Sequence, residues 1–426
     1  MKSSEVTIKI GTGSVSVSRR NLVFYSIILC VFGFLIRYTA AGYTVHSFDM
    51  NYYFDWATGL QNGFFDAYEH IDSLDYPPVL LFFLYPIGLF IKPDWGDNSL
   101  VIMMHLLKSV QIVTDTLLIP VIYICLKRYS VSWALLMSTL WAINPSAIFD
   151  SAFWGQTDSL MMLILLISFT LLDSRRPVAA TIIYALACLT KFQCAYFAPV
   201  FLLFLLFSRY SVKQIMTGLG LGAALVITVF FPFMLHSGIF LPFRVYFGGL
   251  GKYPYATLNA FNLYGLLNMN YVRDDLADGW FTLNTFSMVI LVLIVAFIIW
   301  LYFKAPNKCP WILCVLIMQC IFIFTTRMHE RYEIPVLIFA VAASVKHRDK
   351  NLFISYLGLT VMTYINQYLL FTKAVFPYNA PWLKQYDTLL AVFSLLNIVL
   401  FVYSSYAGLK VLFTTDKPSP VQTAVS

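Results

Sequence analysis

A carboxylate stands just beyond the first apolar stretch of the chain, at Asp49 in the sequence Ser-Phe-Asp-Met. A carboxylate near a membrane surface can take the proton from the hydroxyl group of an incoming acceptor, which is general-base catalysis. Asp49 could also cap a helix over residues 51–60, and capping does not exclude catalysis. Asp55 lies about 120° further around such a helix, so it is a second-choice base or a ligand for sugar hydroxyl groups.

The sequence Trp-Gly-Gln-Thr-Asp lies at a predicted turn between two apolar stretches. Its glycine loosens the turn and leaves Trp154, Gln156 and Asp158 at the tip. Aromatic, amide and carboxylate side chains are common contacts for carbohydrates, so these three residues are predicted to bind the sugar or the acceptor. Asp158 could equally cap the helix that follows.

The sequence Arg-Met-His-Glu-Arg-Tyr places Arg327, His329 and Arg331 within five positions at the predicted outer end of a helix. The planar guanidinium group can donate two hydrogen bonds to one phosphate, so the three residues are predicted to bind a phosphate group. Glu330 between them is predicted to contact the sugar or the acceptor. The alternative is that these side chains merely extend into water at the end of the helix. Arginines without a function are uncommon on the outer face, where the positive-inside rule disfavours them, so two of them count against this alternative.

Lys191 lies between two short apolar stretches, where a charge is costly and needs a partner. The phosphate of a lipid is one candidate partner, and Asp115 and Asp158 are others. Lys191 is therefore added to the predicted phosphate site, and Gln193 to the predicted sugar or acceptor site. Lys108 and Asp115, seven residues apart, should share a helical face and could simply stabilise a helix bundle.

The composition excludes an ordinary soluble domain, since 60% of the 426 residues are hydrophobic and only 12% are charged. The chain is predicted to be an all-α polytopic membrane protein. Its net charge of +7 comes mostly from short basic loops between apolar stretches and does not indicate nucleic-acid binding. The seven cysteines lack the spacing of a metal site and are predicted to be small core residues.

Twelve stretches are predicted to cross the membrane, although several are shorter than the about 20 residues that a crossing needs. They are 21–41, 100–126, 131–148, 159–172, 178–190, 193–208, 214–235, 284–304, 310–326, 332–346, 351–371 and 387–412. The basic loops fall on one side only if Val79–Ile91 is an interfacial or re-entrant helix that does not cross. Both termini are then cytoplasmic, and every unusual polar motif lies on the outer face.

One membrane domain is therefore predicted over residues 21–412, with long outer loops at 42–99 and 236–283. The first loop carries eight of the 21 carboxylates: Asp49, Asp55, Asp66, Glu69, Asp72, Asp75, Asp94 and Asp97. The second is long enough to act as a lid or acceptor platform, and its Arg244 is predicted to contact the sugar or acceptor. The cytoplasmic tails, residues 1–20 and 413–426, are predicted to be disordered.

Taken together, these motifs resemble those of the GT-C membrane glycosyltransferases. The matching residues are Asp49, Asp75-Tyr76-Pro77-Pro78, Asn144-Pro145 with Asp150 and Gln156, Lys191 with Gln193, and Met328-His329-Glu330. The resemblance covers roughly residues 20–345 and is closest to the glucosyltransferases that extend dolichol-linked oligosaccharide and to their bacterial relatives. It implies a sugar on a polyprenyl phosphate as donor, an inverting transfer and Asp49 as the base.

The sequence departs from the metal-binding members of that group, because no Asp-x-Asp motif occurs. We therefore expect no catalytic metal and no cofactor. The expected partners are the polyprenyl-phosphate sugar, a glycan or glycolipid acceptor and membrane lipid, in a bacterial plasma membrane or, in a eukaryote, the endoplasmic reticulum. A lipid-linked sugar flippase is the alternative, but it would need polar groups on both faces. A non-catalytic assembly protein would not need the clustered acids and arginines.

Overall fold

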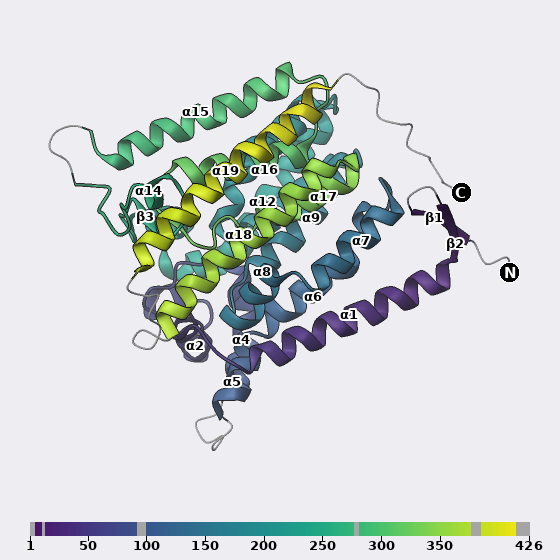
Figure 1. The fold of residues 1–426 in the computed structure, drawn as a ribbon. Coiled ribbons are helices and arrows are strands. Elements are labelled where there is room, and N and C mark those ends of the chain that lie inside the picture. Colours follow the sequence, from purple (N-terminus) through teal and green to yellow (C-terminus); the bar gives the residue numbers. More distant parts are fainter. Residues whose placement is uncertain (1–4, 11–12, 92–98, 277–280, 376–384, 415–426) are drawn as a thin grey trace.

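The computed structural model describes residues 5–10, 13–91, 99–276, 281–375 and 385–414. Within these ranges the chain is almost entirely helical, and most long helices run roughly side by side (Figure 1). Asp94 and Asp97 of the first outer loop and most of the predicted C-terminal tail lie outside the described residues.

Each of the twelve predicted spans contains a helix. Their bounds are α1 Arg19–Ala41, α5 Ser99–Leu107 with α6 Ser109–Leu126, α7 Val131–Ala142 with α8 Pro145–Ile148, α9 Asp158–Asp173, α10 Pro177–Cys188, η3 Phe192–Phe197 with α11 Ala198–Phe207, α12 Val212–Ser237, α15 Leu283–Lys304, α16 Pro310–Phe324, α17 Val336–His347, α18 Lys350–Val375 and α19 Tyr386–Phe413. Among the described residues, five helices are long and apolar enough to cross a membrane: α1, α6, α12, α15 and α19. A sixth span results if α7 and the bent segment after it count as one.

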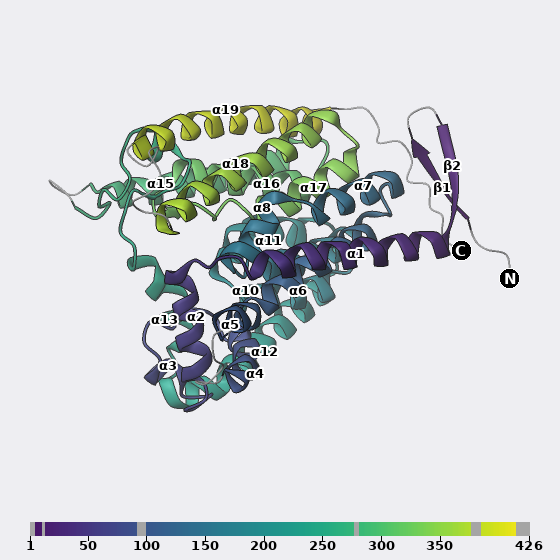
Figure 2. The same ribbon diagram turned by 60° about the horizontal axis from the view of Figure 1, so that its bottom comes forward.

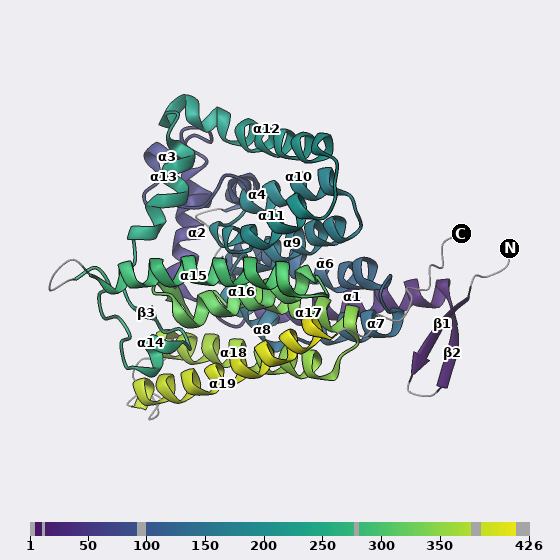
Figure 3. The same cartoon turned by 90° about the horizontal axis from the view of Figure 1, so that it is seen from above.

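The predicted outer loops form short helices and one small parallel sheet. These elements are α2 Ser47–Gly59, α3 Ala67–His70, α4 Val79–Phe90, the π-helix η2 Phe149–Trp154, α13 Leu241–Gly248, η4 Gly249–Gly251, α14 Leu263–Leu266, β3 Thr257–Leu258 and β4 Met328–His329. In all three views α2 lies at the end of the bundle opposite the N-terminal hairpin, and Figure 3 shows α13 and β3 at the same end as α2 (Figures 1, 2 and 3). The fold therefore brings the polar motifs to one end.

The opposite end of the bundle joins segments that the charge pattern places on the inner face. Asp173 at the end of α9 accepts hydrogen bonds from Arg128 (2.7 Å) and Lys346 (2.8 Å). Arg348 donates to the backbone oxygen of Tyr129 at 3.0 Å. Three predicted inner loops thus meet around one carboxylate.

Helix α2, which carries Asp49, packs against α4 in an apolar cluster at the end of the bundle that holds the predicted outer loops. Tyr53 and Trp56 of α2 are buried there beside Leu81 of α4 and Phe233 of α12. The helices approach closely at Gly88, because a Cβ atom there would lie 2.0 Å from the backbone oxygen of Ala57. The predicted helix at Val79–Ile91 is thus confirmed as a helix, and it packs closely against α2.

The N-terminal segment does not match the prediction of disorder. Strands β1 (Glu5–Ile10) and β2 (Gly13–Ser18) form an antiparallel hairpin that leads into α1. Valine and isoleucine recur at alternate positions, Val6, Ile8 and Ile10 in β1 and Val15 and Val17 in β2, and such β-branched residues favour strands. The richness of this segment in serine and glycine concealed that pattern.

A buried ion pair fixes α1 to the rest of the bundle. Arg37 donates from Nε to Asp115 at 2.6 Å, and both side chains are fully buried. Asp115 also accepts hydrogen bonds from Trp141 (2.8 Å) and Ser151 (2.7 Å). Asp115 thus stabilises the helix bundle, as the sequence suggested for Lys108 and Asp115. Lys108 lies one residue before α6 rather than in it, and it binds backbone carbonyl groups of neighbouring segments.

Candidate active site

Asp49 lies in the first turn of α2 and is held by the turn that precedes α9. Trp154 donates from its indole nitrogen to Oδ2 of Asp49 at 2.6 Å, and Gln156 donates from Nε2 to the same oxygen at 2.8 Å. The amino-terminal end of a helix also stabilises a negative charge. The structure thus brings together the Ser-Phe-Asp-Met and Trp-Gly-Gln-Thr-Asp motifs, which lie about a hundred residues apart in the sequence.

The two oxygens of Asp49 are not equivalent. His46 Nδ1 lies 3.2 Å from Oδ2, and Arg331 Nη1 lies 4.0 Å from the same oxygen. The hydrogen bonds and ion pairs recorded between Asp49 and the described residues therefore all fall on Oδ2. Oδ1 keeps its capacity to accept a hydrogen bond, and the side chain is 16% exposed. A carboxylate that is fixed through one oxygen can receive a proton on the other.

The π-helix η2 is what aims Trp154 at Asp49. Asn144 caps the preceding turn, since its side chain accepts from the backbone of Ala147. Gly155 then adopts φ +91°, which favours glycine, and a Cβ atom there would lie 2.8 Å from Cε of Met50. Single π turns occur often at functional sites. The sequence indicated a loosened turn at this place but not its π-helical form.

Arg331 stands between Asp49 and Glu330. Its Nη1 donates to Glu330 at 2.6 Å, and its guanidinium group lies 5.6 Å from the ring centre of Trp154. Its Nε is buried and has no hydrogen-bond partner among the described residues. Arg331 therefore has a donor available for an anion beside the candidate base.

Burial and charge set the protonation states of these groups. Burial raises the pKa of Asp49, but the positive charge of Arg331 and the contacts with His46 and Trp154 outweigh it and hold the pKa well below its usual range. Burial, assisted by the charge of Arg331, lowers the pKa of His329 to about 3. At neutral pH, Asp49 is therefore ionised and His329 is neutral.

Lys191 has a carboxylate partner, and that partner is Asp158. Its ammonium group lies 2.9 Å from both carboxylate oxygens, and the side chains are 4% and 2% exposed. Of the two carboxylates considered as partners, the fold thus selects Asp158, while Asp115 binds Arg37. The predicted contact of Lys191 with a lipid phosphate stays a prediction. Gln193, two residues further along the chain, is also buried. Its side-chain oxygen has no hydrogen-bond partner among the described residues.

Arg327 binds the carboxylate of Asp274, whereas Arg331 binds that of Glu330 and lies near that of Asp49. Its Nε and Nη2 donate to Asp274 at 2.8 and 3.0 Å, and Thr326 donates to the same carboxylate at 2.9 Å. Asp274 is fully buried in the second outer loop. The guanidinium group therefore ties that loop to β4 rather than approaching Asp49.

Asp55 and Arg244 are not brought to Asp49. Both are exposed, Asp55 on α2 and Arg244 on α13. Within the described ranges neither side chain makes a recorded hydrogen bond or ion pair, which leaves their predicted contacts with the sugar or acceptor as proposals. No group of three or more His, Cys, Asp or Glu residues in those ranges could hold a metal ion.

Several residues of the site were not singled out from the sequence. His46 stacks on Trp154 with ring centres 4.5 Å apart. Lys252 of the second outer loop forms an ion pair with Asp75 of the first at 2.9 Å. His46 precedes Asp49 by one helical turn, which is a signal that the sequence did contain. The Lys252–Asp75 pair had none, because it joins two long loops.

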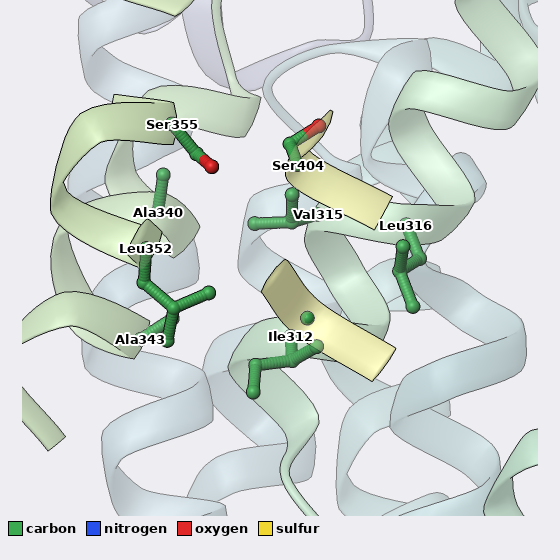
Figure 4. Close-up of a pocket in the computed structure, with 9 residues that line it drawn as sticks. Ile312, Val315, Leu316, Ala340, Ala343, Leu352, Ser355 and Ser404 are labelled. Carbon is green, nitrogen blue, oxygen red and sulfur yellow. The ribbon is translucent and has the colours of Figure 1, made fainter. Parts of the chain in front are cut away.

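Two cavities among the described residues contain none of the predicted site residues. One is a narrow apolar cavity of about 10 Å³ between α16, α17, α18 and α19, into which Ile312, Val315 and Leu316 point (Figure 4). The other, of about 340 Å³, lies at the outer end and is lined by Asn268, Asn270, Asp387, Thr388 and Leu390. The first has room for no more than about one water molecule.

Comparison with known proteins adds a family and a fold. The model of glycosyltransferase family 87 matches residues 74–325, a segment that includes Trp154 and Lys191 and lies between Asp49 and Arg331. The crystal structure of ArnT from Cupriavidus metallidurans bound to undecaprenyl phosphate is similar over 93% of this chain and 78% of ArnT, with a TM-score of 0.50 and 12% identity. No curated protein matches the chain. The likeness to ArnT confirms the all-helical, polytopic membrane fold, and the family match confirms the resemblance to glycosyltransferases.

Proposed function

The chain belongs to glycosyltransferase family 87, and from this premise we propose that it moves a sugar from a polyprenyl phosphate to a hydroxyl group of a glycan, glycolipid or glycoprotein acceptor at the outer membrane face. The observation that carries the proposal is the geometry of Asp49, which is fixed through Oδ2 and open at Oδ1, beside a guanidinium group with an unused donor. The bound undecaprenyl phosphate of ArnT, a protein of similar fold, supports a lipid phosphate as the carrier.

The proposed step is a single displacement with inversion at the anomeric carbon. The acceptor oxygen attacks that carbon, the bond between the carbon and the phosphate oxygen breaks, and the acceptor proton passes to Oδ1 of Asp49. The polyprenyl phosphate leaves with the electron pair of the broken bond. Arg331 offsets the charge that develops on the phosphate, since preorganised donors at such positions lower the barrier.

Donor binding should also increase the basicity of Asp49. In the free protein Arg331 lies 4.0 Å from Asp49 and lowers its proton affinity. A phosphate that engages Arg331 adds a negative charge beside the carboxylate, which raises the proton affinity of Asp49 when the acceptor must be deprotonated. His329, neutral at its lowered pKa of about 3, would contribute a hydrogen bond rather than a positive charge.

The decisive assay uses purified protein, liposomes and a panel of synthetic polyprenyl-phosphate sugars with glycolipid acceptors. We expect transfer of one sugar, with an inverted anomeric configuration in the product. Movement of the lipid-linked sugar across the bilayer without transfer would favour the flippase alternative. Neither transfer nor movement with any donor would count against the proposal.

The pH dependence of the reaction should show the effect of Arg331 on Asp49. Because Arg331 holds the pKa of Asp49 below the usual value of about 3.9, kcat/KM should show no acid limb above about pH 4. In Arg331→Gln burial dominates, so the pKa of Asp49 rises and an acid limb should appear above that pH. Arg209→Gln, at an exposed arginine at the end of α11, is the matched control. An acid limb at the same pH in Arg331→Gln and wild type would contradict this coupling.

Topology gives an independent prediction. If both termini are cytoplasmic, Asn62 after α2 faces outward and Lys127 after α6 faces inward, and both residues are exposed. A membrane-impermeant maleimide should label Asn62→Cys in intact cells and Lys127→Cys only after lysis. The unsubstituted protein corrects for its own cysteines. The reverse pattern would overturn the proposed orientation.

A further inference from the structure

Lys108 lies directly before α6, and its side chain is completely buried. Its ammonium group donates to four backbone oxygens: Ala41 at 3.1 Å, Thr44 at 2.6 Å, Ala152 at 2.8 Å and Phe153 at 3.0 Å. In the part of the chain that the structure describes, these carbonyl oxygens are its only recorded partners. A buried ammonium group is costly unless it is hydrogen-bonded, and here four acceptors surround three N–H donors.

The four carbonyl groups belong to the two segments that carry the candidate base and its donors. Ala41 ends α1, and Thr44 lies in the link to α2, five residues before Asp49. Ala152 and Phe153 lie near the end of the π-helix η2, immediately before its last residue, Trp154. One ammonium group therefore ties the segment of Asp49 to the segment of Trp154.

Gln111, almost one turn further along α6, extends this contact. Its Nε2 donates to the backbone oxygen of Gly155 at 2.9 Å, and the side chain is buried. Gly155 separates Trp154 from Gln156, the two residues that donate to Asp49. The start of α6 thus holds the backbone on both sides of the indole group.

We infer that Lys108 and Gln111 form a clamp that positions Trp154 and Gln156 on Asp49 and so sets the orientation and basicity of that carboxylate. The inference rests on the proposed function, in which Asp49 is the base. Both residues act through others and do not contact the substrates. A displacement of about 1 Å at a reacting group can cost about 100-fold in rate, so loss of the clamp should act mainly on the chemical step.

The test compares Lys108→Met, which keeps the length of the side chain and removes its donors, with Lys108→Arg and the exposed control Lys213→Met. Per folded molecule, we expect kcat of Lys108→Met to fall about 10–100-fold with donor affinity unchanged. Its acid limb should move to higher pH, because a displaced Trp154 no longer stabilises ionised Asp49. Lys108→Arg should recover part of the rate, and Lys213→Met should match wild type.

A role in folding alone would lower the yield of folded protein but leave kcat and the acid limb unchanged, and that result would overturn the inference. If Lys108→Met does not fold, Gln111→Leu decides: a lower kcat with a shifted acid limb supports the clamp, and wild-type values overturn it. Asp49→Asn is measured alongside. If Asp49→Asn retains wild-type turnover, Asp49 is not the base. If wild type transfers no sugar, the proposed function itself fails. If Asp49→Asn is inactive while the clamp variants match wild type, only the clamp fails.

Discussion

Asp49→Asn should abolish turnover while leaving the protein folded. An acceptor hydroxyl group is a poor nucleophile at neutral pH, and a positioned general base contributes about 10²–10⁴-fold to the rate. In the wild-type protein Trp154 and Gln156 donate to Oδ2 of Asp49. Asparagine has the same size, and its amide oxygen can still accept these two hydrogen bonds. Its amide nitrogen would then occupy the position of Oδ1, where it cannot take a proton.

Binding of the donor should not weaken in this variant. The carboxylate of Asp49 competes for Arg331 in the free protein at 4.0 Å, so its removal leaves the guanidinium group at least as available to a phosphate. Asp55→Asn is the comparison: it is the same substitution on the same helix at an exposed position, and it should lower turnover much less. Turnover and donor binding are measured for each purified variant.

Two results would contradict the mechanism in different ways. If Asp49→Asn retains more than about a tenth of wild-type turnover, Asp49 is not the base, given the size of that contribution. Another carboxylate of the outer end, Asp55 or Asp158, would then be the better candidate. If the product keeps the anomeric configuration of the donor, the single displacement is excluded whatever Asp49 does.

Lys191→Met should strongly destabilise the fold. The side chain of Asp158 is only 2% exposed, so the substitution would leave a buried carboxylate without its cation. Removing one partner of a buried ion pair costs about 3–5 kcal/mol of stability. Thermal unfolding of the purified protein should show a lower midpoint and a smaller folded yield. The double variant Lys191→Met with Asp158→Leu should recover much of the loss, because apolar residues of similar volume often replace a buried pair without penalty.

The matched control is the ion pair between Arg273 and Asp275, whose side chains are 48% and 37% exposed. Arg273→Met should change the unfolding midpoint little, since water screens the attraction in an exposed ion pair. A Lys191→Met protein as stable as wild type but with weakened donor binding would instead support the phosphate role predicted for Lys191.

The positions of the helices could be predicted from the sequence because they depend on local composition. An apolar stretch must become a helix in a membrane, since its backbone groups have no other partners there. All twelve predicted spans contain a helix for that reason, and the helix at Val79–Phe90 was also foreseen. The same locality identified Asp49, Trp154 and Gln156 as candidate site residues, each within a short motif.

The partners of the charged residues were decided only by the tertiary structure. From sequence, Asp115 and Asp158 were equal partners for Lys191, and Arg327 and Arg331 were equal candidates for a phosphate. Packing gave Asp158 to Lys191 and Asp274 to Arg327, and it left Arg331 beside Asp49. A contact between residues far apart in the chain depends on how helices pack, which local composition does not specify.

The tertiary structure also decided the protonation state of His329 and the backbone conformation before Gly155. The pKa of His329 falls to about 3 because the fold buries it near Arg331, and sequence alone does not determine burial. The π-helix at Phe149–Trp154 is followed by Gly155 at positive φ, and two of its carbonyl groups accept hydrogen bonds from the distant Lys108. Composition thus determined where the chain is helical and which motifs are polar, whereas the orientation of Asp49 required the packing of α2, α6 and η2.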